Sequence, residues 1–183
     1  MQSPYLVGTH VYLRALNLDD APVVQRHINN PEVVQNLMAW RPLSLEHEAA
    51  WIERTAESET DVVFDIARRE EDRLIGTAGL HQIDWRSRTA GFGIQIGDPA
   101  EWGKGFGTEA TRLVTAYGFT RANLNRIWLH VYDTNPAGVR VYEKAGYRRE
   151  GVLRQGVFRE GAYHDVYVMA ILANEWRAAN PAR

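Results

Sequence analysis

Cysteine is absent from this 183-residue chain. The lack of thiols excludes a disulfide framework, a cysteine-ligated zinc or iron–sulfur centre and a catalytic cysteine. Long apolar runs are also lacking, since no stretch reaches 18 apolar residues and the first eight residues do not resemble a signal peptide. We therefore expect a cytoplasmic protein that does not bind a membrane.

The chain also lacks an excess of positive charge. Its 21 Lys and Arg residues against 23 Asp and Glu residues give a formal net charge of −2. Binding driven by phosphate neutralisation needs a basic surface, so we expect no nucleic-acid partner. The six histidines include no pair at i+3 or i+4 spacing, and no metal site is predicted. The four serines form no G-x-S-x-G motif, which argues against a serine hydrolase.

The elements that are present indicate one domain over residues 1–183 with an α/β (α+β) fold. The antiparallel strand order followed by a strand–helix–strand unit indicates a mixed central sheet of about six to seven strands flanked by helices. Alternation and β-rich composition predict strands at residues 9–14, 62–68, 74–83, 89–96, 126–132, 147–153 and 163–172. Capping residues and apolar spacing predict helices at residues 22–29, 44–58, 108–123 and 135–145.

A glycine-rich loop precedes the helix that is predicted to begin at about Thr108. Residues 102–110 read WGKGFGTEA. Alternate glycines let backbone N–H groups converge on an anion at a helix N-terminus, so a phosphate or pyrophosphate site is predicted, with a flexible turn as the alternative. Lys104 lies between the glycines and Thr108 takes the last position, which excludes both a Walker A loop and a G-x-G-x-x-G fingerprint.

This loop resembles the acyl-CoA pyrophosphate loop of the GNAT N-acetyltransferases, Q/R-x-x-G-x-G/A, with Trp102 in the Q/R position. A second segment, NPA at 135–137 followed by YEKAGY at 142–147, resembles the family signature N-x-x-A/S…Y-E-K-x-G-F/Y. The form WGKGFGTEA is similar to the branch that contains ribosomal-protein N-terminal acetyltransferases and spermidine acetyltransferase. The resemblance implies the GNAT acyl-CoA acyltransferase fold and acetyl-CoA as co-substrate.

The resemblance further implies that the pantetheine arm of CoA lies between two neighbouring parallel strands, residues 93–97 and 127–132. Asn135 has a second interpretation as a plain helix N-cap. The implied CoA contacts are Gln95, Ile96, Gly97, Trp102, Gly103, Lys104, Gly105, Phe106, Gly107, Thr108 and Asn135.

Tyr142 is implied to give a proton to the departing CoA sulfur. A phenol with a pKa near ~10 is protonated at neutral pH and can protonate a thiolate. The alternative for Tyr142 is a core tyrosine on the inner face of its helix.

His130 is predicted to be the general base that takes a proton from the acceptor amine, directly or through one water. Side chains alternate along residues 126–132, so Trp128, His130 and Tyr132 share one face. An imidazole pKa of ~6.5 suits proton transfer at neutral pH. Some family members carry a glutamate base at the position of His130, and others carry one where this chain has Gly91. The alternative is a half-buried strand histidine with a structural hydrogen bond.

The expected acceptor is a primary amine, either a protein N-terminal α-amine or another small amine. A polyamine such as spermidine is the alternative, and it would need a cluster of carboxylates. The candidate acceptor segments, residues 29–43 and 153–165, hold both signs of charge: Glu32, Glu160 and Asp165 beside Arg41, Arg154 and Arg159. Two other classes are a non-catalytic acyl-CoA-binding module and a nucleotide-phosphate-binding protein. The resemblance also implies a possible homodimer.

Overall fold

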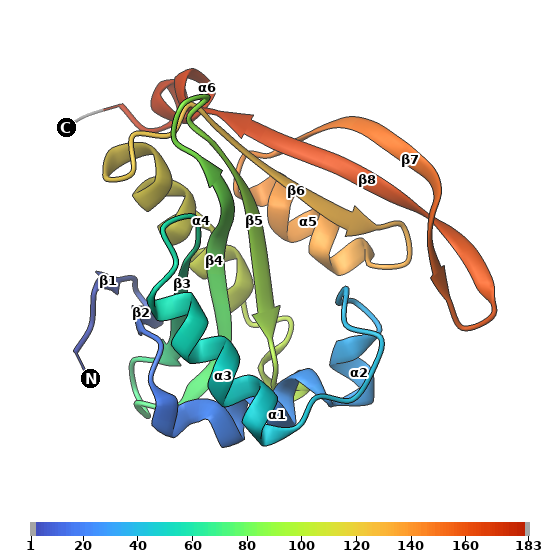
Figure 1. Cartoon of the computed structure of the whole chain (residues 1–183). Helices are drawn as coiled ribbons and strands as arrows, with labels where there is room; N and C mark the ends of the chain where they lie inside the picture. The colour runs from blue at the N-terminus through green and yellow to red at the C-terminus, as the bar shows by residue number, and fades with distance from the viewer. Residues whose placement is uncertain (1–2, 182–183) are drawn as a thin grey trace.

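The computed structural model describes residues 3–181 and contains a mixed sheet with helices on both faces (Figure 1). Within these residues the sheet has eight strands in the order β1-β2-β3-β4-β5-β6-β8-β7. The predicted fold class is confirmed. The strand number is higher than the expected six to seven because two-residue β1 pairs with β2, with Leu6 opposite Leu13. A strand this short leaves no alternation in the sequence.

The strands form two groups that meet at one parallel pair. The first five are antiparallel neighbours joined in chain order, and β6 then joins β5 in parallel through the helical crossover that such a pair requires. The antiparallel pair of β7 and β8 extends beyond the body of the sheet (Figure 1). The strands are β1 (Leu6–Val7), β2 (Val11–Ala15), β3 (Val62–Arg68), β4 (Leu74–Asp84), β5 (Thr89–Ile96), β6 (Arg126–Tyr132), β7 (Arg148–Arg159) and β8 (Ala162–Leu172).

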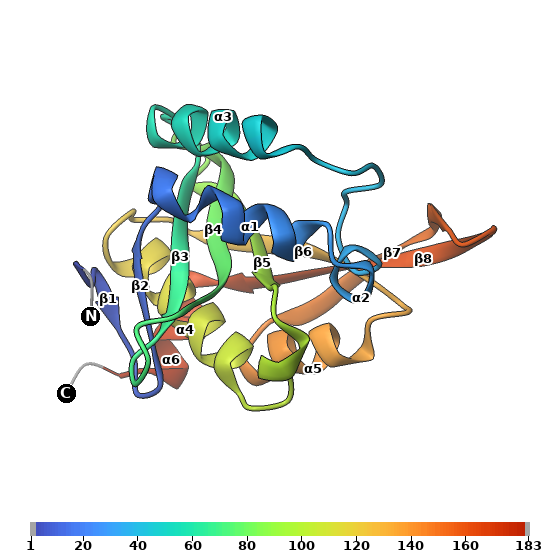
Figure 2. The ribbon, with the colours of Figure 1, turned by 90° about the horizontal axis from the view of Figure 1, so that it is seen from below.

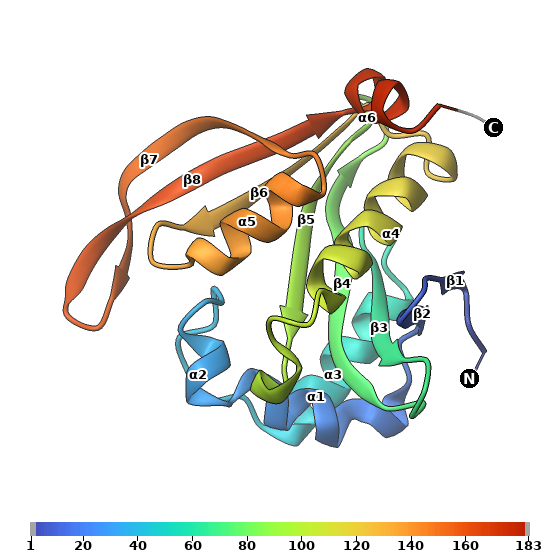
Figure 3. The same cartoon turned by 180° about the vertical axis from the view of Figure 1, so that it is seen from behind.

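The helices divide between the two faces of the sheet (Figures 2 and 3). Helices α1 (Ala21–Ile28), α2 (Pro31–Val34) and α3 (Leu45–Ala56) lie on one side, with the 3₁₀ turn η1 (Leu18–Asp20) before them. The other side carries α4 (Phe106–Thr120), α5 (Pro136–Lys144) and α6 (Ala173–Ala179), and the 3₁₀ turn η2 (Pro99–Glu101) leads into α4.

Helix α4 packs against the core of the sheet. Its buried face includes Val114 and Phe119, which belong to one cluster with Leu80 of β4 and Ile127 of β6. Gly118 lets the helix approach the sheet closely, since a Cβ there would lie 2.7 Å from Cδ1 of Ile127. None of the helices in the described part of the chain combines the length and the apolar character that a membrane span requires.

Local signals in the sequence set most helix starts correctly. The Ser44 side chain accepts a hydrogen bond from the His47 N–H at 3.2 Å and caps α3. Asn30 accepts from the Glu32 N–H and starts α2 directly after the break that ends α1.

The structure differs from the predictions mainly at two boundaries and at two helices, α2 and α6, that were not predicted. Helix α4 begins at Phe106, before the predicted Thr108, because Gly105 in a left-handed conformation forms its N-cap. Strand β7 continues to Arg159 instead of ending at 153, because its pairing with β8 resumes beyond an irregularity between Leu153 and Val157. Helix α6 lacks a strong capping residue and was not predicted.

Candidate active site

The parallel strands β5 and β6 separate midway along their length. They pair from Thr89 opposite Arg126 only as far as Gly91 opposite Trp128. Beyond that point β5 stays with β4 up to Ile96, whereas β6 stays with β8 up to Tyr132. A gap therefore opens inside the sheet, and the facing edges of β5 and β6 are not paired with each other there (Figure 1).

A cavity of about 450 Å³ runs from this gap to the N-terminus of α4. Ten of the residues predicted from the sequence line it, and Gly97, Lys104 and His130 do not. Those ten are Gln95, Ile96, Trp102, Gly103, Gly105, Phe106, Gly107, Thr108, Asn135 and Tyr142. The sequence did not identify the rest of the wall, which comes from β5, η2, α2 with the segment after it, and α5. These residues are Ile94, Glu101, Val33, Asn36, Leu37, Ala137, Gly138, Arg140, Val141 and Lys144.

The glycine loop has the backbone conformation that its composition predicts. Gly103 and Gly105 have φ values of 74° and 90°, and a Cβ at either position would meet no atom within 4 Å. Gly105 is the N-cap of the fifteen-residue helix α4. The loop thus presents open backbone at a helix N-terminus, where unpaired N–H groups and the helix dipole favour an anion.

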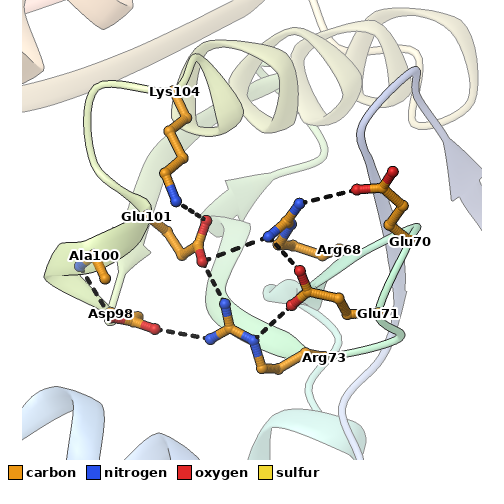
Figure 4. Close-up of polar contacts among 8 residues, drawn as sticks. All are labelled: Arg68, Glu70, Glu71, Arg73, Asp98, Ala100, Glu101 and Lys104. Carbon is orange, nitrogen blue, oxygen red and sulfur yellow. Dashed lines mark hydrogen bonds and ion pairs between the residues drawn. The ribbon is translucent and has the colours of Figure 1, made fainter.

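A buried carboxylate supports the loop from below (Figure 4). Glu101 is 4% exposed and contacts Arg73, Lys104 at 3.2 Å and Arg68 at 3.7 Å. Burial alone would raise the pKa of Glu101, but its bonds to Lys104 and Arg73 hold that pKa below the ordinary value. Asp98 accepts a further bond from Arg73 at 2.7 Å, which fixes the start of the loop.

Two of the predicted CoA contacts, Lys104 and Gly97, do not line the cavity. The ammonium of Lys104 contacts Glu101, which does line it (Figure 4). Gly97 lies against His27 of α1, where a Cβ would come within 2.2 Å of the His27 side chain, so its lack of a side chain serves packing. Trp102 lines the cavity and its indole N–H donates to the Ile96 carbonyl at 2.8 Å, which holds the loop on β5.

Tyr142 reaches the cavity from α5 within an aromatic cluster. Its ring centroid lies 6.2 Å from those of Phe92 and Tyr147, and its side chain is 8% exposed in total. Burial raises the pKa of Tyr142 to about 12. The phenol is therefore protonated throughout the neutral range, as a proton donor must be. Tyr142 is thus a core residue that also lines the cavity, and its role as proton donor stays a prediction.

Asn135 caps α5 and also lines the cavity. Its Oδ1 accepts a hydrogen bond from the Gly138 N–H at 2.8 Å. This bond uses the amide oxygen and not the amide nitrogen of the side chain.

His130 lies on the exposed part of β6, opposite Val168 of β8. It shares its face with Trp128, and the two ring centroids are 5.1 Å apart. The Trp128 ring in turn covers Gly91 of β5, since a Cβ there would lie 3.3 Å from it. The predicted face of β6 is therefore correct, and it adjoins the start of the gap.

The segment after α2 closes one end of the cavity by contacts that are distant in the sequence. The Leu37 carbonyl accepts hydrogen bonds from the Arg159 side chain of β7 and, at 3.4 Å, from the Tyr132 hydroxyl of β6. Partners separated by 95 and 122 positions give no local signal in the sequence. Among residues 3–181 no cluster of three or more potential metal ligands is found.

Comparisons with known proteins agree with this geometry. Residues 10–148 match the family model described as an acetyltransferase (GNAT) domain. The uncharacterized N-acetyltransferase p20 of Bacillus licheniformis is 32% identical over 90% of this chain and 93% of its own length. Spermidine N(1)-acetyltransferase of Vibrio cholerae is 31% identical over 93% of this chain and 97% of its own.

The crystal structure of the Vibrio cholerae spermidine N-acetyltransferase in complex with CoA and spermine is also similar. It superposes with a TM-score of 0.86 at 30% identity, covering 92% of this chain and 99% of that one.

Proposed function

This chain belongs to the GNAT acetyltransferase family and is an N-acetyltransferase, and from that premise we propose which groups it uses and which amine it acetylates. The co-substrate is acetyl-CoA, and the acceptor is a small molecule or peptide with one primary amine. The observation that carries the proposal is the continuous cavity from the glycine loop to the gap between β5 and β6.

Acetyl-CoA fits the residues that line this cavity. The open backbone at Gly103 and Gly105 suits the pyrophosphate, because neither residue has a side chain that could obstruct its approach. The unpaired strand edges beyond Gly91 and Trp128 suit the amide groups of the pantetheine arm. Asn135 has an amide nitrogen for the same arm.

Tyr142 is proposed as the proton donor to the sulfur of CoA. Its raised pKa keeps the hydroxyl protonated, and its position on the cavity wall supports contact with the thioester. As the acceptor nitrogen bonds to the acetyl carbon and the C–S bond breaks, the thiolate takes the phenolic proton. The amine must lose its own proton to a group on the acceptor side, for which the sequence predicts His130.

The acceptor is proposed to carry a single positive charge. Arg159 donates to the Leu37 carbonyl, so its guanidinium lies beside the end of the cavity that Leu37 lines. A polycation would be repelled there, whereas an N-terminal α-amine or a small monoamine would not. The second candidate is a polyamine, which the similarity to spermidine acetyltransferases favours.

A panel of amines tests both candidates. Release of free CoA is followed with an N-terminal peptide, a small monoamine, spermidine and spermine. We expect kcat/KM to be higher for a monoamine or peptide than for spermidine. A preference for spermidine would assign the second candidate, and binding of acetyl-CoA without turnover on any amine would contradict the enzyme assignment.

A further inference from the structure

Two glycines of β5 leave a space on the side of the gap that faces away from Tyr142. Side chains alternate along a strand, and the Phe92 ring points to the face where it meets Tyr142 at 6.2 Å. Gly91 and Gly93 therefore look toward the opposite face. Gly93 lies two residues beyond the last pair of β5 with β6, so this space adjoins the open gap.

The imidazole of His81 occupies the space over Gly93. A Cβ on Gly93 would lie 3.3 Å from Nε2 and 3.4 Å from Cδ2 of His81. His81 comes from β4, where it pairs with Gly91, and its side chain is 38% exposed. The Nε2 atom thus lies next to the backbone of Gly93, and the imidazole as a whole is partly exposed.

Asp61 holds the other nitrogen of the same ring. Its Oδ1 lies 3.4 Å from Nδ1 of His81 and accepts a hydrogen bond from the Gln82 N–H at 3.1 Å. Its Oδ2 accepts from the Ser58 hydroxyl at 2.9 Å. A carboxylate anchored by two donors orients the imidazole and leaves Nε2 as the free nitrogen.

A local irregularity of β4 makes this arrangement possible. The pairing with β5 shifts register between His81 and Asp84, and Gln82 takes a φ of 52° there. This conformation turns the Gln82 N–H toward Asp61. A positive φ at a non-glycine residue is costly, and bulges of this kind are over-represented next to active sites.

The electrostatics keep the ring neutral near neutral pH. Burial lowers the pKa of His81, and the nearby Asp61 carboxylate offsets part of that effect. Burial would raise the pKa of Asp61, but hydrogen bonds from Ser58 and Gln82 and the contact with His81 hold that pKa below its ordinary value. The pair is therefore a neutral imidazole beside a carboxylate, which is the state that can accept a proton. Trp128 and His130 of β6 border the same face.

We infer that His81 is the general base of the acetyl transfer and that Asp61 is its positioning residue. This inference rests on the proposed function and specifies the group that the acceptor amine contacts. Tyr142 and His81 lie on opposite faces of β5, so the amine arrives from one side and the sulfur departs on the other.

The proton balance follows from this arrangement. Nε2 of His81 takes one proton from the ammonium, and the freed electron pair of nitrogen forms the C–N bond to the acetyl carbon. The C–S bond breaks as the carbonyl re-forms, and the sulfur takes the proton of Tyr142. The second proton of the nitrogen leaves to water as the amide forms, the tyrosine regains a proton from water, and the imidazolium of His81 releases its proton to water before the next turnover.

His130 and His81 differ in the contacts that their imidazole rings make. His81 has an ordered carboxylate on Nδ1 and lies over Gly93 at the gap, whereas His130 lies on the exposed part of β6 beside Trp128. We assign His130 to the wall of the acceptor site.

The test compares His81→Gln, Asp61→Asn and His130→Gln with the wild-type chain, on the amine that gives the highest turnover. Glutamine can still donate to Asp61 but cannot take a proton. We expect kcat/KM of His81→Gln at neutral pH to fall by about 10²-fold or more. The acidic limb that belongs to histidine should disappear from its pH profile, while the KM for acetyl-CoA stays unchanged.

Asp61→Asn tests the same inference with His81 still in place, by the position of the acidic limb in the pH profile. Without the carboxylate the pKa of His81 falls further, so the acidic limb of kcat/KM should move to lower pH. His47→Gln, an exposed histidine of α3, is the matched control and should leave rate and profile unchanged. Circular dichroism melts of each variant separate loss of folding from loss of chemistry.

The outcomes distinguish this inference from the function on which it rests. An inactive wild-type chain on every amine would overturn both. An active chain whose rate and acidic limb survive His81→Gln would overturn the inference alone, and loss of the limb in His130→Gln instead would assign the base to His130. A His81→Gln chain too unstable to assay leaves the decision to Asp61→Asn, where an unmoved limb contradicts the inference.

Discussion

Replacing Gly105 with valine tests the glycine loop as the CoA pyrophosphate site. Gly105 has φ 90° and ψ −6° as the N-cap of α4, and a Cβ there would meet no atom within 4 Å. The substitution is therefore opposed by backbone conformation and not by a clash. A side chain in the left-handed region costs roughly 1–2 kcal/mol. Each kcal/mol lowers the Tm of a domain of this size by about 2–4 °C, so we expect a fall of about 2–8 °C.

The effect on CoA binding should be larger than the effect on stability. Valine relieves the strain if residue 105 returns to a negative φ, which turns the N–H groups at the start of α4 away from the ligand. One hydrogen bond to a charged group is worth about 1.5–3 kcal/mol. Since 1.4 kcal/mol is about tenfold in Kd, the Kd for CoA measured by calorimetry should rise at least about tenfold.

Gly161→Val is the matched control. Gly161 has a φ of 83°, a Cβ there would also meet no atom within 4 Å, and it lies in the turn between β7 and β8. It should lose a similar amount of Tm and keep its CoA affinity. Unchanged affinity in Gly105→Val, or equal loss in both variants, would refute the role of the loop.

Three further substitutions test other parts of the structure. Tyr142→Phe should keep the affinity for acetyl-CoA and lower kcat by about 10²–10⁴-fold, and a kcat within about twofold of wild type, with chemistry limiting, would leave Tyr142 as a packing residue. Glu101→Gln should lower Tm at neutral pH, because the ionised carboxylate stabilises the fold. The folded-state pKa of Glu101 lies below its unfolded value, so this stabilisation is present above the unfolded pKa and is lost as pH falls through the folded pKa. The Tm difference from wild type should therefore shrink in acid. A Tm difference that does not depend on pH would argue against the ionised network. Gly118→Ala should destabilise the fold by about 1–3 kcal/mol, because its Cβ would lie 2.7 Å from Ile127, and denaturant unfolding with an unchanged midpoint would contradict that close packing.

Local signals in the sequence were sufficient for most of the fold. Alternation gave β3 and β6 with their observed bounds, and the caps Ser44 and Asn135 gave the starts of α3 and α5. The end of β7 could not be predicted, because its last residues are held by pairing across an irregularity and not by their own pattern.

The candidate site divides in the same way. The glycine loop and Tyr142 each lie in a short contiguous motif, so the sequence was sufficient to predict them as site residues. His81 and Asp61 are 20 residues apart in sequence, and their contact depends on a register shift in β4 that no composition or period reveals. The signal that was overlooked is Gly93, which leaves room for the imidazole of His81.

Strand β7 has a consequence for how the protein behaves at high concentration. It is the outermost strand of the sheet, so its free edge offers backbone donors and acceptors to any other extended chain. It also exposes Leu153 and Phe158, which would add apolar contact to such a pairing. Two register shifts bend the strand, and the exposed guanidinium groups of Arg148, Arg149 and Arg154 give it like charge. The bends and the charge together disfavour edge-to-edge polymerisation, so neutral replacements of these arginines should lower solubility before they lower activity.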